Sequence, residues 1–355
     1  METTIIDRYR KIQNGYNSSS KKQTDLYELK RQIALQFGSS IDYEAGTKIN
    51  NVIQKLIVIH TDNEFKKNVI AYPDSTFKIG DIVDLSQTEN VGYWHYAHSF
   101  VRGNWNNSNT SSPMILAKCC HDLDMINYLI GKSCIGLSSI GSLKYFKKEC
   151  KPKGATHRCT DGCPHLETCE YNAINVYINN ATDNNNGWLS QYVSVDQSKE
   201  SVMNGLKTGP YGICVWDCDN NVVDHQSVLM QYEDEITASL HMNIFSKDCF
   251  RELRISGTKG EIIANDRDNI IKITCWNGDS EIIDIKKECP DMTGHGNGDL
   301  VLTNRFIDML SHENCHVDNI DQSVASHINA FAAEESRILG GKNILIDDYI
   351  KEILK

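Results

Sequence analysis

Several features that would assign this 355-residue chain to a broad class are missing from its sequence. It contains no run of eighteen or more apolar residues, which excludes a predicted membrane span. Its amino terminus mixes charged and polar residues and lacks the apolar core of a secretory signal. The formal net charge of −11 argues against a broad nucleic-acid surface, because phosphate binding needs clustered lysine and arginine. We therefore expect an acidic cytoplasmic protein without nucleic-acid or membrane partners.

A nucleotide-binding motif is also missing. A dinucleotide-binding unit begins with a strand, a glycine-rich turn and a helix. Residues 1–78 contain only the isolated glycines Gly15, Gly38 and Gly46. The glycine-dense stretch GHGNGD (294–299) lacks the third glycine at the required spacing, so we interpret it as a loop. The sequence predicts no complete Rossmann domain.

Residues 1–78 and residues 79–355 form two unlike segments. Apolar spacing predicts two helices within 1–37, followed by strand-like runs at 55–60 and 68–72. The run VIAYPDSTFKIGDIVD (69–84) resembles small head-to-tail connector proteins of tailed phages. The alternative is an unclassified helical cap.

A second resemblance covers nearly all of residues 79–355. It begins with KIGD (78–81) and TENVGYWHYAHSFVRGNW (88–105), and it continues with SPMILAKCCHDLD (112–124). Shorter matching strings follow in order: TGPYG (208–212), NVVDHQ (221–226), GTKGE (257–261) and FAAEESR (331–337). These strings resemble the C-terminal, substrate-binding domain of the Gfo/Idh/MocA oxidoreductase family.

The periodicity of residues 79–355 indicates an α+β fold. Strand-like alternation occurs at 237–245, 252–256 and 270–276, and helices are predicted at 121–131, 299–311 and 322–340. Strands in succession followed by helices predict an open, mostly antiparallel sheet with helices on one face. The family resemblance implies that the free face packs against a second subunit, so we expect a homo-oligomer.

His121 is the candidate catalytic base. Oxidation of a sugar hydroxyl requires removal of the O–H proton by a group with a pKa near neutrality. Asp124 lies three residues further along the predicted helix and could orient the imidazole. Many family members have an aspartate four residues before this histidine; that position is Ala117 here, and Lys118 could supply the polar partner instead. The alternative is a helix-start histidine with a local hydrogen bond.

A group of aromatic and polar residues forms the predicted sugar pocket. Aromatic faces and hydrogen-bond donors suit a sugar, and an arginine can hold a carboxylate or a phosphate. For any one of these residues, a packing role at a strand edge is the alternative. The predicted substrate-binding residues are Tyr93, Trp94, His95, His98, Arg102, Asp224 and His225.

The string RCTDGCPHLETC (158–169), together with Cys150, forms a cysteine cluster. Thirteen cysteines in a chain without a secretion signal indicate thiols or metal ligands rather than disulfides. Four soft ligands suit a structural zinc site, and four thiolates also suit an iron–sulfur cluster. The predicted ligands are Cys150, Cys159, Cys163 and Cys169, with free thiols as the alternative.

The resemblance implies the family reaction, an NAD(P)-dependent oxidation or reduction of a sugar or cyclitol hydroxyl. The family holds its nicotinamide on a first domain that carries a Glu-Lys-Pro motif, and this tripeptide does not occur in the chain. We therefore expect a chain that lacks the cofactor domain and is inactive alone. The alternative hypotheses are a non-catalytic, rearranged fusion product and a phage structural protein.

Overall fold

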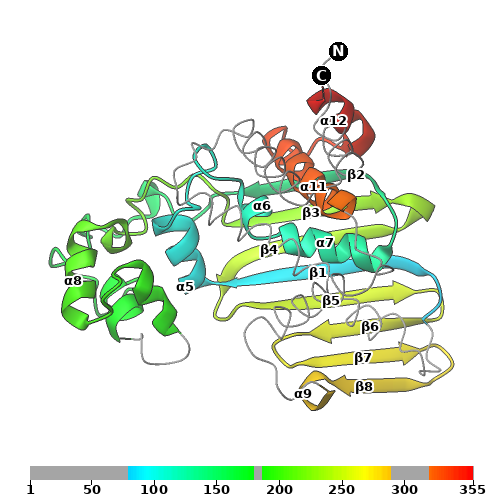
Figure 1. The fold of residues 1–355 in the computed structure, drawn as a ribbon, viewed down its shortest axis with the longest axis horizontal. Coiled ribbons are helices and arrows are strands. Elements are labelled where there is room, and N and C mark those ends of the chain that lie inside the picture. The colour runs from blue at the N-terminus through cyan, green and yellow to red at the C-terminus, as the bar shows by residue number, and fades with distance from the viewer. Residues whose placement is uncertain (1–78, 180–185, 289–319, 355) are drawn as a thin grey trace, which may run out of the picture. The chain divides into compact units, whose positions relative to one another are not determined.

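The centre of the protein is one nine-stranded sheet, seen in a computed structural model that describes residues 79–179, 186–288 and 320–354 (Figure 1). The strand order is β8-β7-β6-β5-β1-β4-β3-β2-β9. The strands are β1 (Ile82–Gly92), β2 (Cys134–Ser142), β3 (His225–Tyr232), β4 (Thr237–Ser246), β5 (Phe250–Gly257), β6 (Gly260–Asn265), β7 (Ile270–Cys275), β8 (Ser280–Asp284) and β9 (Ile344–Leu345).

The sheet is mostly antiparallel, as the sequence predicted. Only β1 and β4 run parallel among the described strand pairs, and Leu85 of β1 lies between Ala238 of β4 and Ile255 of β5. Buried and accessible residues alternate along much of the sheet, as in β3, where Val228 and Met230 are buried and Leu229 is exposed. This period of two gives the sheet one face packed on the core and one accessible face.

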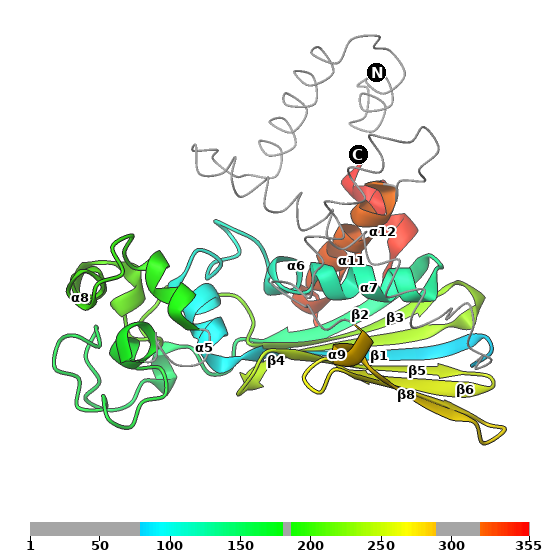
Figure 2. The same cartoon turned by 60° about the horizontal axis from the view of Figure 1, so that its bottom comes forward.

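Helices cover one face of the sheet. Helices α6 (Met114–Ala117), α7 (Cys120–Ile130) and α11 (Ile320–Ile338) lie side by side above β1, β2, β3 and β4 (Figure 2). Helix α7 ends at Gly131, which has a left-handed backbone (φ 68°) and donates its N–H to the Asn127 carbonyl at 2.8 Å. This is a common way to stop a helix, because glycine adopts that conformation without a Cβ clash.

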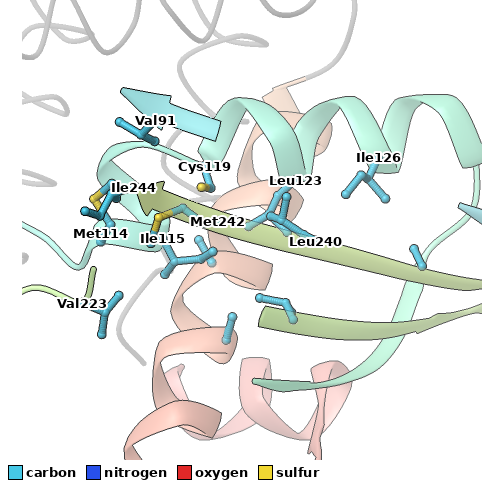
Figure 3. Close-up of a cluster of buried hydrophobic side chains, with 14 of the residues drawn as sticks. Val91, Met114, Ile115, Cys119, Leu123, Ile126, Val223, Leu240, Met242 and Ile244 are labelled. Carbon is cyan, nitrogen blue, oxygen red and sulfur yellow. The ribbon is translucent and has the colours of Figure 1, made fainter. Parts of the chain in front are cut away.

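The main hydrophobic core lies between these helices and the sheet. Leu123 and Ile126 point from α7 toward Leu240 and Met242 of β4 (Figure 3), and all four are fully or almost fully buried. Burial of an aliphatic side chain of this size contributes about 1.5–3 kcal/mol. The core therefore fixes the position of α7, and with it the position of His121.

A smaller unit, called the lobe below, consists of residues 93–102, 148–179 and 186–216 and follows directly from the end of β1 (Figure 1). It has a core of its own, which includes Tyr177, Leu189 and Leu206. Its elements are α5 (Tyr93–Tyr96), η1 (Ala97–Arg102), η2 (Lys148–Cys150), η3 (Asn175–Asn179), η5 (Asn186–Tyr192), α8 (Lys199–Thr208) and η6 (Pro210–Gly212).

The remaining described elements are short: η7 (Glu233–Glu235), α9 (Ile285–Glu288) and α12 (Ile346–Ile353). None of the described helices is both long and apolar enough to span a membrane.

The predicted α+β fold is confirmed, including the helices expected at 121–131 and 322–340. The helix expected at 299–311 lies outside the described residues, and so do the helices and strands expected within 1–78. The phage-connector resemblance also rests almost wholly on those residues, and the domain boundary at residue 78 stays a prediction.

Candidate functional site

The candidate site lies where α6 meets α7. Pro113 precedes α6, which ends after one turn at Ala117; Lys118 and Cys119 link it to α7, which begins at Cys120. This places half-buried His121 in the first turn of α7 and Lys118 just before it.

Four ionisable residues from different elements converge beneath this turn, and we call them the charge cluster: Glu89, Lys118, Asp122 and Arg251. Lys118 Nζ lies 3.0 Å from Glu89 Oε1. Arg251 Nε lies 2.9 Å from Glu89 Oε2 and 2.7 Å from Asp122 Oδ1. Gln87 donates to the same Asp122 oxygen at 2.5 Å. When both carboxyl groups are ionised, the cluster is charge-balanced, with two cations facing two anions.

Burial and mutual charge change the pKa values within the cluster. Burial, followed by repulsion from Asp122, raises the pKa of Glu89 to about 7, although Lys118 and Arg251 oppose this. Burial alone would also raise the pKa of Asp122, but Arg251, Lys118 and His121 outweigh it and hold that pKa below its usual value. Asp122 is therefore the permanent anion of the cluster, and Glu89 is the member that titrates near neutral pH.

Sequence reasoning missed most of this cluster. Asp122, Glu89 and Arg251 were not among the predicted residues, and Asp122 pairs with Arg251. Asp124, predicted to orient His121, lies buried on the same helix. Glu89 had a detectable signal, because it follows Leu85 and Gln87 at the strand period of two and so belongs to the core face of β1. A carboxylate at such a position needs a buried cation.

The predicted aromatic set divides between the edge and the interior of the lobe. Tyr93, Trp94 and His95 are half-buried. Trp94 Nε1 donates to the Lys247 carbonyl at 3.2 Å, in the turn that leads to β5 and Arg251. The structure thus brings Trp94 toward the strand that supplies the charge cluster.

His98 and Arg102 lie inside the lobe, and the structure does not support the sugar contact predicted for them. The His98 ring stacks on Tyr211 with centroids 5.0 Å apart, and its Nδ1 lies 3.0 Å from the Tyr177 hydroxyl. Burial, followed by the charge of Arg102, lowers the pKa of His98 to about 4, so this ring is neutral at pH 7. Arg102 donates to the backbone carbonyls of Ile213 and Tyr171.

Asp224, predicted to bind substrate, has structural partners in this fold. Its side chain is fully buried, and one oxygen accepts the backbone N–H groups of Lys144 and Tyr145, both at 2.7 Å. The other oxygen lies 2.7 Å from His225 Nδ1. Asp224 therefore fixes the segment after β2 to the start of β3, and half-buried His225 is its partner.

The structure brings three of the four predicted cysteine ligands together and places Cys150 elsewhere. Cys159, Cys163 and Cys169 line one small pocket in the lobe, but the fourth cysteine there is Cys214. The Cys150 thiol instead donates to the Lys144 carbonyl at 3.7 Å. Across the described residues, no group of three or more His, Cys, Asp or Glu side chains is already arranged as a set of metal ligands.

The fold is that of an α+β domain with one mostly antiparallel sheet. Residues 76–314 match the family described as "Oxidoreductase family, C-terminal alpha/beta domain", and the chain belongs to this Gfo/Idh/MocA family. No curated protein matches the chain.

Solved structures show the same fold at low sequence identity. An NAD binding oxidoreductase from Klebsiella pneumoniae aligns with a TM-score of 0.51 and 11% identity, over 81% of this chain and 64% of that one. An oxidoreductase domain protein from Kribbella flavida aligns with a TM-score of 0.50 and 10% identity, over 82% of this chain and 65% of that one. Levoglucosan dehydrogenase in complex with NADH and levoglucosan aligns with a TM-score of 0.49 and 12% identity, over 82% of this chain and 64% of that one. This chain thus spans less than two thirds of each.

The described residues do not fit a nicotinamide cofactor. A dinucleotide-binding fold contains two parallel strands joined by a crossover helix. The phosphates of the cofactor bind at the N-terminus of that helix. The parallel neighbours β1 and β4 are far apart in the chain and are joined through the lobe, β2 and β3. No glycine-rich turn follows β1, which leads directly into α5 at Tyr93.

Proposed function

We propose that this chain is the substrate-binding part of an NAD(P)-dependent oxidoreductase that acts on a hydroxyl group of a sugar or cyclitol. The observation that carries the proposal is the position of His121, half-buried in the first turn of α7 and next in sequence to Asp122 of the charge cluster, whose pKa it helps to lower. The family membership supports the reaction type, and the substrate class rests on the family resemblance and the chemistry of the site.

In this proposal His121 would accept the hydroxyl proton, and the oxidised nicotinamide, when bound, would supply the hydride acceptor for the carbon that bears this hydroxyl. A proton on His121 creates a positive charge, and Asp122, the neighbouring residue and the permanent anion, stabilises it. Lys118 keeps its charge, because Glu89 raises its pKa against the opposing effect of burial. Lys118 is thus a fixed hydrogen-bond donor for a substrate oxygen beside His121.

The edge of the lobe supplies the remaining substrate contacts. Trp94 and His95 form an edge-to-face pair with centroids 5.6 Å apart, and His95 also faces the ring of Trp188 at 6.0 Å. Aromatic faces of this kind pack against the C–H groups of a sugar ring. Tyr93 packs edge-on against Tyr171 and supports this edge.

The proposal includes no hydride transfer by this chain alone, because its described residues do not fit the nicotinamide. We propose a cytoplasmic protein that is inactive without a cofactor domain from another source. Of the alternative functions, a phage structural protein predicts no sugar-binding site at α7, whereas a non-catalytic fusion product keeps the fold and weak ligand binding without turnover.

Binding experiments on the purified chain separate these possibilities. We expect no saturable NADH or NADPH binding in calorimetry, whereas a panel of hexoses and inositols should contain a ligand that raises the melting temperature of the wild type. His121→Asn and Lys118→Met should each lose that shift, while His241→Asn, an exposed residue of β4, should keep it. Binding of NADH or NADPH at micromolar concentration would contradict the proposal that the chain is inactive alone. A panel in which no compound binds would contradict the proposed sugar-binding site.

A further inference from the structure

We propose that Cys159, Cys163, Cys169 and Cys214 bind one structural zinc ion in the lobe. These four cysteines line a single pocket, which Tyr171, Trp216 and Arg102 help to close. The proposal concerns the lobe and is independent of the chemistry proposed for His121.

The backbone brings Cys159 and Cys214 together although they are distant in sequence. Arg158 and Ile213 form an antiparallel bridge, with Cys159 N–H donating to the Gly212 carbonyl at 3.0 Å and Cys214 N–H to the His157 carbonyl at 2.8 Å. Both cysteines directly follow the bridged residues. In extended backbone, neighbours of a bridged pair point to the face opposite that pair, so the two thiols share one face.

The other two cysteines come from the compact turn that follows Cys159. Leu166 N–H donates to the Cys163 carbonyl at 3.4 Å, and Cys169 N–H donates to the His165 carbonyl at 2.9 Å. These bonds fold the chain back, so that Cys163 and Cys169 reach the same pocket as Cys159. Four cysteine thiolates are one of the usual ligand sets of structural zinc.

The charge of Arg102 is the second observation that indicates a ligand here. This side chain is 3% exposed, its Nη2 lies 3.8 Å from Cys159 Sγ, and its Nη1 is buried without a hydrogen-bond partner. No carboxylate pairs with Arg102 in the described part of the chain; the titratable groups near it are Tyr177 and the cysteines 159, 214 and 218. A buried guanidinium needs a compensating anion.

Four thiolates around Zn²⁺ supply that compensation, because the complex carries a net charge of −2. Arg102 would offset part of this charge, and the Ala173 N–H, 3.5 Å from Cys159 Sγ, would donate to a coordinated sulfur. Hydrogen bonds and cations of this kind around the ligands commonly stabilise thiolate–metal sites. Metal binding releases the four thiol protons to solvent.

Nearby alternative ligands have other partners. His165 Nε2 lies 3.0 Å from the Lys153 carbonyl, and His157 Nδ1 lies 3.4 Å from Asp217. The Cys218 thiol donates to the Cys214 carbonyl at 3.4 Å. The four thiols do not yet stand at ligand separations, since no such group occurs among the described residues. Zinc binding therefore requires them to rotate about χ1 between staggered positions within the shared pocket.

Elemental analysis of protein purified without chelator tests the site. We expect about one zinc per chain in the wild type and in Cys150→Ser, and a loss of zinc in Cys214→Ser. The variant Cys214→His should keep the metal, because imidazole also ligates zinc. Cys249→Ser, a substitution of an exposed cysteine outside the lobe, is the matched control and should keep it too.

Chelation of the wild type provides a test that does not depend on the folding of a variant. We expect a zinc chelator to lower the melting temperature and to make four thiols reactive per zinc released. The proposal would be overturned by the absence of zinc, or by loss of zinc in Cys150→Ser with retention in Cys214→Ser. Iron with acid-labile sulfide, or a disulfide between these cysteines, would also overturn it. None of these outcomes would change sugar binding at α7, so the two proposals can fail separately.

Discussion

At the residue scale, Glu89 determines how the candidate site responds to pH. Its carboxylate is 2% exposed and contacts both cations of the charge cluster, yet burial and the neighbouring Asp122 still raise its pKa. Near pH 7 the cluster therefore exists in two protonation states. In one of them Lys118 faces a neutral carboxyl group and is more available to a ligand.

The stability of the protein should fall as the pH rises through this range. The folded protein keeps a proton on Glu89 up to about pH 7, whereas an exposed glutamate releases it near pH 4.5. The stabilisation is therefore complete below about pH 4.5 and is lost as the pH rises through 7, with a limiting slope of ~1.4 kcal/mol per pH unit. Urea denaturation between pH 4.5 and 8 should show this slope in the wild type and a flatter profile in Glu89→Gln. Parallel profiles would contradict the assignment.

At the element scale, α7 matters most, because it positions His121 and Asp122 while its apolar side chains anchor it in the core. Its end depends on Gly131, whose left-handed backbone allows the N–H to reach the Asn127 carbonyl. A Cβ at this position would meet no atom within 4 Å. The need for glycine therefore comes from the backbone conformation and not from crowding.

Gly131→Ala should lower the free energy of unfolding by about 1 kcal/mol, because alanine is strained in the left-handed region. Gly131→Asn should cost less, since asparagine tolerates that conformation better. Urea denaturation of both variants measures the difference. Equal stability of the alanine variant and the wild type would show that the helix end does not depend on this conformation.

At the scale of the whole molecule, the accessible face of the sheet is the feature that one chain leaves incomplete. No described helix covers the face opposite α7 and α11 (Figure 2). It carries exposed apolar residues on adjacent strands: Ile140 of β2 at 72%, Leu229 of β3 at 61% and Phe245 of β4 at 48% exposed. Exposed apolar groups on neighbouring strands of one sheet face are typical of a protein interface.

We expect the wild-type chain to form a homo-oligomer through this face. Ile140→Asp combined with Leu229→Asp should yield a monomer, because buried carboxylates without partners oppose association. Light scattering coupled to size exclusion measures the mass. Val195→Asp, at a lobe position that is 96% exposed, is the control and should leave the mass unchanged. A monomeric wild type would remove the expectation.

The sequence by itself determined the family, the mostly antiparallel sheet and the position of His121 on a helix. These features depend on local patterns, such as the period of two in β4 and the glycine after α7, which neighbouring residues specify without the rest of the chain. The first turn of α7 was therefore a predictable place for His121.

Only the tertiary structure decided which residues surround the candidate site. Arg251 and Asp122 are 129 positions apart in sequence, and no local pattern pairs them. Cys214 replaced Cys150 in the cysteine pocket because a backbone bridge, not sequence spacing, brings it to Cys159. Asp224 and His98 carry side chains suited to sugar binding, but packing buries both, and burial is a property of the whole fold.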